Sequence, residues 1–199
     1  MLSSCHTGMP ERLLLGAGLF LTGFDPGASG SAGEMRRRLV SAVRTGEGVL
    51  GATRGGGTFS CVPMLRSLEE GARRTPSMGS MLLDGWLVRM TGTLVEITPD
   101  TLASLLPGAA IARQGCVSTL TLRSDIAEED FLPTLCWIGD TPRGFVLIEM
   151  TAALNLAGAQ LITREHGEGE MPFVFQAHSA SWEDEDAPVR MLFFTEEDA

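Results

Sequence analysis

Apolar and polar residues alternate along much of the chain, which is typical of β-strands with one buried face. The longest such segment spans residues 81–97, where Trp86, Val88 and Met90 share one face. Beyond Gly92 the apolar residues occupy a different set of positions. Because a change of face at a glycine is what a β-bulge or a barrel corner produces, the pattern predicts a long strand with one of these at Gly92.

Shorter segments of the same character are separated by residues that favour turns. The strands they predict span residues 13–15, 58–62, 64–72, 116–122, 134–138, 145–149, 159–163, 172–178 and 189–194. Gly16 is expected to end the first of them, and Pro63 is expected to end the second as an edge strand. The turn-forming residues 139–144 predict a hairpin between the fifth and sixth.

Two segments have helical spacing instead. In residues 34–44 an apolar stripe lies opposite three consecutive arginines at 36–38, which we expect to form a solvated face. The second helix starts with Thr98 as N-cap and Pro99 at its first position, and a Pro-Gly pair ends it. It is too short to be stable alone, so we expect it to pack on a sheet.

Many strands and few helices predict an all-β fold, or an α+β fold in which a helix covers one sheet. The 199 residues fit a single domain with a core large enough to need no disulfides. The four cysteines are far apart in sequence, as expected of reduced thiols in a protein made in a cytoplasm.

Charge is distributed unevenly along the chain. The net charge is −10, and all 15 basic residues are arginines. Residues 1–99 carry 10 Arg and 8 acids, whereas residues 100–199 carry 5 Arg and 17 acids, so the two halves have net charges of +2 and −12. Affinity for a phosphate backbone comes from contacts with cationic side chains, so a net negative charge argues against sequence-specific nucleic-acid binding. A surface that must let DNA slide past benefits from negative charge, and we expect the second half to supply it.

No sequence motif gives a strong indication of a catalytic or ligand-binding site. The glycines of residues 51–57 lack the lysine that a phosphate-binding loop requires, and the acidic runs lack the ligand spacing of a calcium loop. Cys136 and His178 form the one nucleophile–base pair worth considering, but Cys136 lies in an apolar run that favours a buried, inert thiol. We therefore predict no enzyme activity, no catalytic residue, no cofactor and no metal.

The apolar stretch at residues 13–21 is too short to span a bilayer and is interrupted by glycines. No basic region precedes it, as a signal peptide would require. We predict neither a signal peptide nor membrane insertion.

Several segments, in order, resemble the major tail-tube proteins of long-tailed, siphovirus-like phages and prophages. The most specific is Gly51-Ala52-Thr53-Arg54-Gly55-Gly56-Gly57-Thr58-Phe59. Others are Leu15-Gly16-Ala17-Gly18 with Phe24-Asp25, Pro63 and Arg66, Glu69, Gly71-Ala72-Arg73, Asp84-Gly85-Trp86, Leu94-Val95-Glu96-Ile97-Thr98, Trp137-Ile138-Gly139, Ala153-Leu154-Asn155 and Phe175-Gln176-Ala177-His178. The chain departs from that family in having no lysine and in residues 28–47, which have no evident counterpart.

The resemblance implies a β-sandwich or partly open barrel with one flanking helix. It implies a single tail-tube domain over residues 1–199, with 1–33 as an N-terminal arm and 45–80 as an extended loop between rings. The inter-subunit contacts it implies are Gly51, Thr53, Arg54, Gly55, Gly56, Gly57, Arg66 and Arg73.

The implied function is that of a structural subunit that forms stacked hexameric rings around a channel for genome delivery. The implied partners are further copies of the chain, a tape-measure protein, tail terminator and distal tail proteins, and DNA in non-specific passage. The implied location is the virion tail, with assembly in the host cytoplasm. Two alternatives remain: another ring protein of a tail, baseplate or contractile-injection inner tube, or a monomeric β-sandwich binding module.

Overall fold

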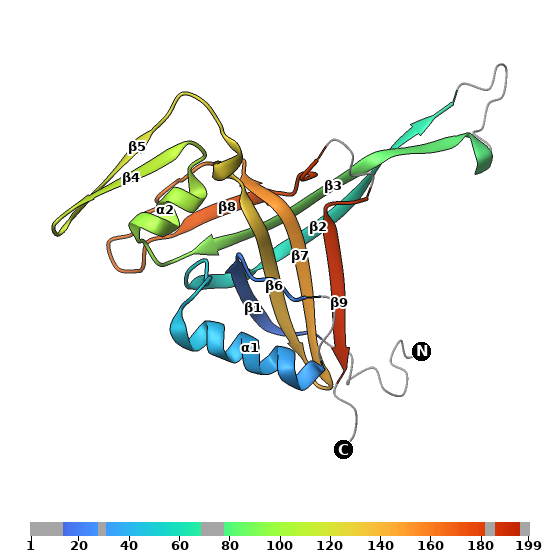
Figure 1. The fold of residues 1–199 in the computed structure, drawn as a ribbon, viewed down its shortest axis with the longest axis horizontal. Helices are drawn as coiled ribbons and strands as arrows, with labels where there is room; N and C mark the ends of the chain where they lie inside the picture. Colours follow the sequence, from blue (N-terminus) through green and yellow to red (C-terminus); the bar gives the residue numbers. More distant parts are fainter. Residues whose placement is uncertain (1–13, 28–30, 69–77, 182–185, 196–199) are drawn as a thin grey trace.

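The computed structural model describes residues 14–27, 31–68, 78–181 and 186–195 (Figure 1). Its strands are β1 (Leu15–Thr22), β2 (Thr53–Ser67), β3 (Met81–Leu94), β4 (Ala109–Gln114), β5 (Val117–Leu122), β6 (Leu132–Thr141), β7 (Gly144–Asn155), β8 (Met171–Gln176) and β9 (Val189–Thr195). Its helices are α1 (Ala32–Thr45) and α2 (Pro99–Leu105), with single 3₁₀ turns η2 (Met78–Ser80) and η3 (Glu128–Asp130). The predicted β-rich class is therefore confirmed.

The main strands form an antiparallel arrangement in the order β1-β6-β7-β8-β3-β2, with β9 also paired to β7. We call β1, β6, β7 and β9 sheet A, and β8, β3 and β2 sheet B. Strand β7 belongs to both, because its last residues pair with β8 after most of the strand has paired with β6 and β9. Ala152 lies at this transition and has a φ of +43°, which is unusual for a residue with a side chain. The chain therefore passes from one sheet to the other along a single strand.

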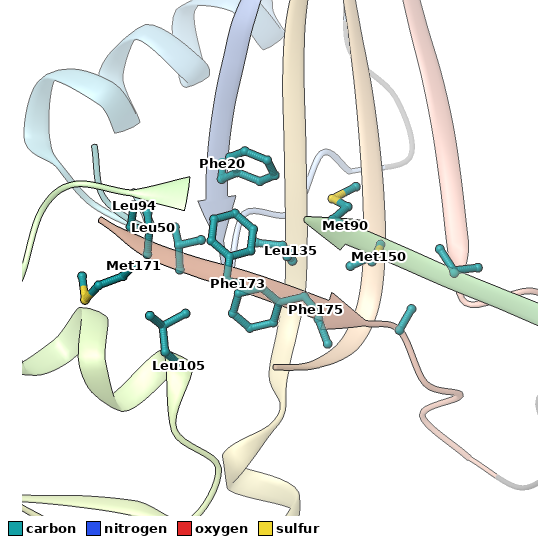
Figure 2. Close-up of a cluster of buried hydrophobic side chains, with 13 residues drawn as sticks. Phe20, Leu50, Met90, Leu94, Leu105, Leu135, Met150, Met171, Phe173 and Phe175 are labelled. Carbon is teal, nitrogen blue, oxygen red and sulfur yellow. The ribbon is translucent and has the colours of Figure 1, made fainter. Parts of the chain in front are cut away.

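The principal core lies between the two sheets (Figure 2). Phe173 and Phe175 of β8 are fully buried, and the Phe173 ring meets Phe20 of β1 edge to face with centroids 5.2 Å apart. Gly92 faces the same ring, since a Cβ added there would lie 2.5 Å from Phe173 Cζ. The predicted bulge or barrel corner at Gly92 is wrong, because β3 pairs regularly with β8 through this residue. The glycine makes room for an aromatic ring instead of bending the strand.

A second core lies between sheet A and α1. Met35 and Leu39 of the helix are buried against Leu21, Cys136 and Leu147 of the sheet. Alternate residues of sheet A thus face sheet B and α1 in turn, which explains why its strands are apolar on both faces. The resemblance implied one flanking helix; the structure has a second, α2, whose Leu105 enters the principal core.

The local signals of α2 act as predicted. Thr98 Oγ1 accepts a hydrogen bond from the Thr101 N–H, and Pro99 occupies the first turn. Beyond the helix, β4 and β5 form a separate two-stranded ribbon that projects from the body (Figure 1). Strand β5 was expected from the sequence, whereas β4 was not.

The hairpin of β6 and β7 was expected, but its loop is shorter than predicted, since pairing continues to Thr141 and Gly144. Strand β9 matches the prediction for residues 189–194. The strand expected at 159–163 is reduced to one bridge, between Ile162 and Glu170.

The glycines near the N-terminus do not end a strand as predicted. Strand β1 runs through Gly16 and Gly18, with a register irregularity before Leu19. Both glycines have positive φ values, and the Trp137 side chain occupies the space that a Cβ of Gly18 would fill. Part of the predicted N-terminal arm, 1–33, is therefore a strand of sheet A. Residues 1–13 lie outside the described part of the chain.

Of the predicted extended loop, 45–80, the structure describes residues 45–68 and 78–80, and residues 53–67 of these form strand β2. Strand β2 continues through Pro63 to Ser67 and pairs with β3 along its length. It is an edge strand, as predicted, and an edge tolerates the missing N–H of proline, which explains why Pro63 does not end it. A register shift between Met64 and Leu65, opposite Asp84, is one of two irregularities in this hairpin.

Candidate assembly surfaces

The far half of the β2–β3 hairpin extends well beyond the two sheets (Figure 1). We call residues 62–68 and 78–86 the arm. Large apolar side chains that are at least 38% exposed occur along both of its strands: Val62, Met64, Leu65, Leu68, Met78, Met81, Leu82, Leu83 and Trp86. A concentration of exposed apolar side chains on one projecting element marks interaction sites in soluble proteins. The arm is therefore the strongest candidate binding surface among the described residues.

Cross-strand pairs maintain the structure of the arm. Leu65 lies opposite Leu83, and both are about half exposed, at 55% and 52%. The Arg66 guanidinium forms a bidentate ion pair with Asp84, with N–O distances of 3.0–3.3 Å. Because both partners are exposed, this pair adds little stability and serves mainly to fix side-chain positions. The arm is a hairpin with one register shift, and no second sheet among the described residues covers its apolar side chains.

Strand β2 has a further feature of a binding surface. Within the part of the chain that the structure describes, its ladder partner is β3 alone. Its other edge presents backbone N–H and C=O groups that can pair with another strand. An open edge beside apolar side chains is the combination that strand addition between subunits uses.

The glycine-rich residues of the candidate contact set lie at the opposite end of β2 from the arm. Gly51 is buried, and Gly57 lies against Thr91 and Phe20, where a Cβ would approach Phe20 Cζ to 2.9 Å. Thr53 pairs with Leu94 of β3. Three of the predicted contacts therefore have a role inside the subunit.

Gly55 and Gly56 form the irregular start of β2. Both have a φ of +74°, a left-handed conformation in which a side chain is strained, and nothing lies within 4 Å of a Cβ on Gly55. Arg54, beside them, forms ion pairs with Glu168 and Glu170 of the loop before β8. Gly55 leaves open space for a neighbour, but because both glycines have a positive φ, a larger residue at either one would strain the isolated subunit as well as affect any contact.

The remaining predicted contacts lie elsewhere. Arg66 is nine residues further along β2 than Gly57, or roughly 30 Å at the usual rise of a strand. Arg73 lies outside the described residues. The structure therefore divides the predicted set between the base of β2 and the arm instead of gathering it into one site.

The Cys136–His178 pair shows no sign of forming a nucleophilic site. Cys136 is fully buried, and burial raises the pKa of its thiol to about 12. Its Sγ lies 3.4 Å from the carbonyl oxygen of Phe24, whereas His178 Nδ1 lies 3.2 Å from that of Ala152. Each side chain thus has its own backbone partner, and a thiol with this pKa is a poor nucleophile.

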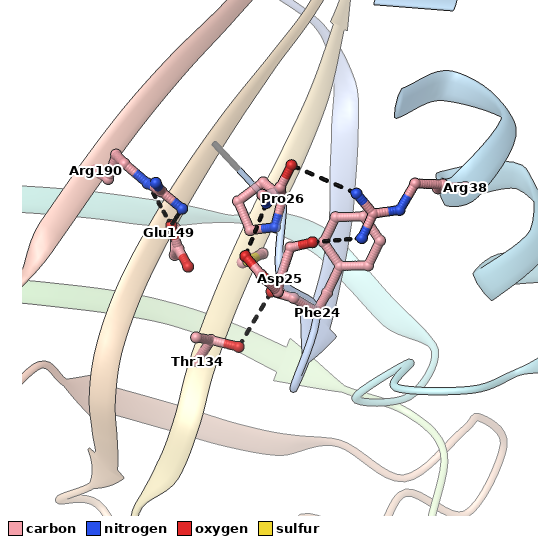
Figure 3. Close-up of polar contacts among 9 residues, drawn as sticks. Phe24, Asp25, Pro26, Arg38, Thr134, Glu149 and Arg190 are labelled. Atoms are coloured by element: carbon pink, nitrogen blue, oxygen red, sulfur yellow. Dashed lines mark hydrogen bonds and ion pairs between the residues drawn. The ribbon is translucent and has the colours of Figure 1, made fainter. Parts of the chain in front are cut away.

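The surroundings of Cys136 hold the β1–α1 connection in place (Figure 3). Thr134 Oγ1 donates to the Phe24 carbonyl at 3.2 Å, and Arg38 of α1 donates to the carbonyl oxygens of Asp25 and Pro26. The Arg38 guanidinium also lies 5.3 Å from the centre of the Phe24 ring. Nearby, Arg190 of β9 and the buried carboxylate of Glu149 form an ion pair at 2.7 Å. These contacts are structural.

Two kinds of site are not found in the described ranges. They contain no group of three or more His, Cys, Asp and Glu side chains suited to a metal ion. No helix among them is both long and apolar enough to cross a membrane.

Comparison with known proteins does not identify the chain. No protein-family model matches the sequence, and no curated protein matches it significantly.

Proposed function

We propose that this chain is a structural subunit of a phage tail tube, assembling as stacked hexameric rings around a channel for genome delivery. The observation that carries the proposal is the arm, whose apolar residues on two paired strands extend beyond the sheets that bury the rest of the core. Exposing the apolar side chains of the arm to water is unfavourable in free energy. An exposed arm of this kind therefore suits a subunit whose neighbours cover it in an assembly.

The fold supports the same proposal in two further ways. The open edge of β2 allows a strand of a neighbouring subunit to pair with it and continue sheet B. An unpaired edge that would promote aggregation of a monomer thus becomes a specific contact between subunits. The β4–β5 ribbon projects as only two strands, an arrangement that is marginally stable unless another surface covers it. In the assembled tube, the channel surrounds a tape-measure protein and later conducts DNA without sequence-specific contacts.

Electron microscopy of the purified chain, combined with sedimentation over a range of concentrations, tests the proposal. We expect long tubes of stacked rings above a critical concentration. Single rings that never stack indicate the alternative of a capping or distal ring component. A monomer at all concentrations contradicts the proposal and favours a β-sandwich binding module.

A further inference from the structure

Helix α1 carries a basic surface on an otherwise acidic chain. Its residues 32–45 include four arginines and one glutamate, a net charge of +3 against −10 for the whole protein. Arg37 and Arg44 are exposed, and neither has an ion-pair partner among the described residues. Arg38 is engaged with the β1–α1 connection and does not contribute to the free surface.

An apolar groove adjoins this basic surface. It has a volume of about 710 Å³ and lies between α1 and the ends of β1, β6 and β7. Leu39 and Phe145 contribute to its lining, and Val40 and Val43 of the helix are about half exposed beside it. Its charged lining residues are Arg36, Arg44 and one carboxylate, Asp140, so the groove is apolar with a net positive charge. Such a groove suits an acidic segment that also carries an apolar side chain.

Such a segment lies at the other end of β6. Residues 123–130, which include η3, carry four acids and one arginine, a net charge of −3. Asp125 and Glu128 are exposed and have no ion-pair partner in the described part of the chain. Ile126, between them, is 59% exposed. This acidic segment thus combines free carboxylates with an exposed apolar side chain.

The two surfaces lie at opposite ends of sheet A. The groove is lined by Ile138 and Asp140, near the end of β6, whereas the acidic segment immediately precedes Leu132, where β6 begins. Ten residues of strand separate these ends, or roughly 30 Å. Figure 1 shows α1 beside the β6–β7 turn and the acidic segment at the opposite end of both strands. One subunit cannot bring the two together, but successive copies can.

We infer that the acidic segment of one copy binds the basic groove of α1 in the next copy, end to end along sheet A. The inference rests on the proposed self-assembly and names the surfaces that join one layer of subunits to the next. A contact between two different surfaces extends an open stack wherever its rotation does not close a ring, and surfaces at opposite ends of one sheet favour the open arrangement. Opposite charges at the two ends also fix the direction in which copies add.

Two charge-reversed variants test this contact. In Arg37→Glu/Arg44→Glu the helix surface becomes acidic, and in Asp125→Arg/Glu128→Arg the acidic segment becomes basic. All four side chains are exposed and free of side-chain ion pairs, so both variants are expected to fold as the wild type does. Each variant alone then brings like charges together, and we expect its critical concentration for stacking to rise on the order of 10-fold or more.

Mixing the two variants in equal amounts is the decisive measurement. Each reversed surface then meets its complement on the other variant, so alternating stacks should form at nearly the wild-type concentration. Arg164→Glu is the control, because Arg164 is an exposed arginine of the loop before β8 that lies outside the arm, the β4–β5 ribbon and both proposed surfaces. Its exposed ion pair with Glu170 adds little stability, so this variant should stack normally.

The outcomes separate this inference from the proposed function. If the wild type assembles but the variants stack equally well, the inference is wrong and the proposed function stands. If both variants fail alone and also fail when mixed, a different partner covers α1 and the inference is again wrong. If the wild type never associates, the proposed function and the inference fall together.

Discussion

Replacing the half-exposed leucine pair of the arm should separate assembly from folding. In the variant Leu65→Thr/Leu83→Thr, two residues that face each other across β2 and β3 lose most of their apolar surface. Threonine is β-branched, a shape that strands favour, so the hairpin itself should persist. The cross-strand contact between the leucines stabilises the subunit by no more than about 1 kcal/mol.

The effect on assembly should be larger than the effect on folding. Complete burial of a leucine stabilises by about 1.5–3 kcal/mol, and these two are 55% and 52% exposed in the isolated subunit. Covering the exposed half of each in a neighbour therefore contributes about 1 kcal/mol, or about 2 kcal/mol for the pair. At 1.4 kcal/mol for each factor of ten, the critical concentration should rise roughly 30-fold.

Sedimentation across a dilution series measures this concentration, and urea unfolding measures the stability of the subunit. The control is Leu156→Thr/Leu161→Thr, which removes leucines that are 50% and 52% exposed outside the arm. An unchanged critical concentration in the arm variant, or an equal rise in the control, would refute the assignment of the arm as an assembly surface.

Three further predictions concern the subunit itself. Gly92→Ala should lower the free energy of unfolding by about 1–3 kcal/mol, because the added methyl group meets the Phe173 ring. Cys136 should react with iodoacetamide at pH 8 at least ~100-fold more slowly than exposed Cys116, because a pKa of about 12 leaves almost no thiolate. Hydrogen bonds from the N–H groups of Ala127 and Gly108, together with Arg123, hold the pKa of Asp130 below its ordinary value. Its ionised form therefore stabilises the fold above about pH 4, and this stability is lost as the pH falls; Asp130→Asn should be less stable at neutral pH and less sensitive to acid.

Each of these has a distinguishing measurement. For Gly92, Gly79→Ala is the matched control, since nothing lies within 4 Å of a Cβ there, and equal losses in both variants would contradict the steric explanation. For Cys136, mass spectrometry of the labelled native protein identifies the reacting thiol, and rapid modification of Cys136 would contradict its burial. For Asp130, urea midpoints at pH 7 and pH 3 suffice, and parallel losses in wild type and variant would contradict the linkage.

Local chemistry explains what could be predicted. The α2 helix is specified by Thr98, Pro99 and Asp100 within a few residues, and the β6–β7 hairpin by two apolar runs around a turn. Such signals depend on near neighbours in sequence, so they hold without knowledge of the fold. Strand β4 carried no comparable signal, because its alanines and polar residues become a strand only by pairing with β5.

Glycine was the main source of wrong predictions. Gly16 was expected to end a strand and Gly92 to form a bulge or a barrel corner, whereas β1 continues through Gly16 and β3 pairs regularly with β8 through Gly92. A glycine in sequence signals freedom of the backbone or room for a neighbour, and only the packed structure distinguishes the two. At Gly92 the neighbour is Phe173, more than 80 residues away.

The sequence by itself determined the β-rich class, the two helices and the burial of Cys136, because alternation, capping residues and apolar context act over short distances. The tertiary structure alone decided which apolar residues stay exposed. Strands β2 and β3 extend beyond the two sheets, so the apolar side chains in the projecting half of the hairpin are not buried. It also decided where part of the charge lies: of the half-chain total of −12, a net charge of −3 lies in residues 123–130 at one end of β6, and the arginines of α1 lie at the other end. The distance between the acidic segment and the arginines is set by the length of β6, and amino-acid composition contains no information on that distance.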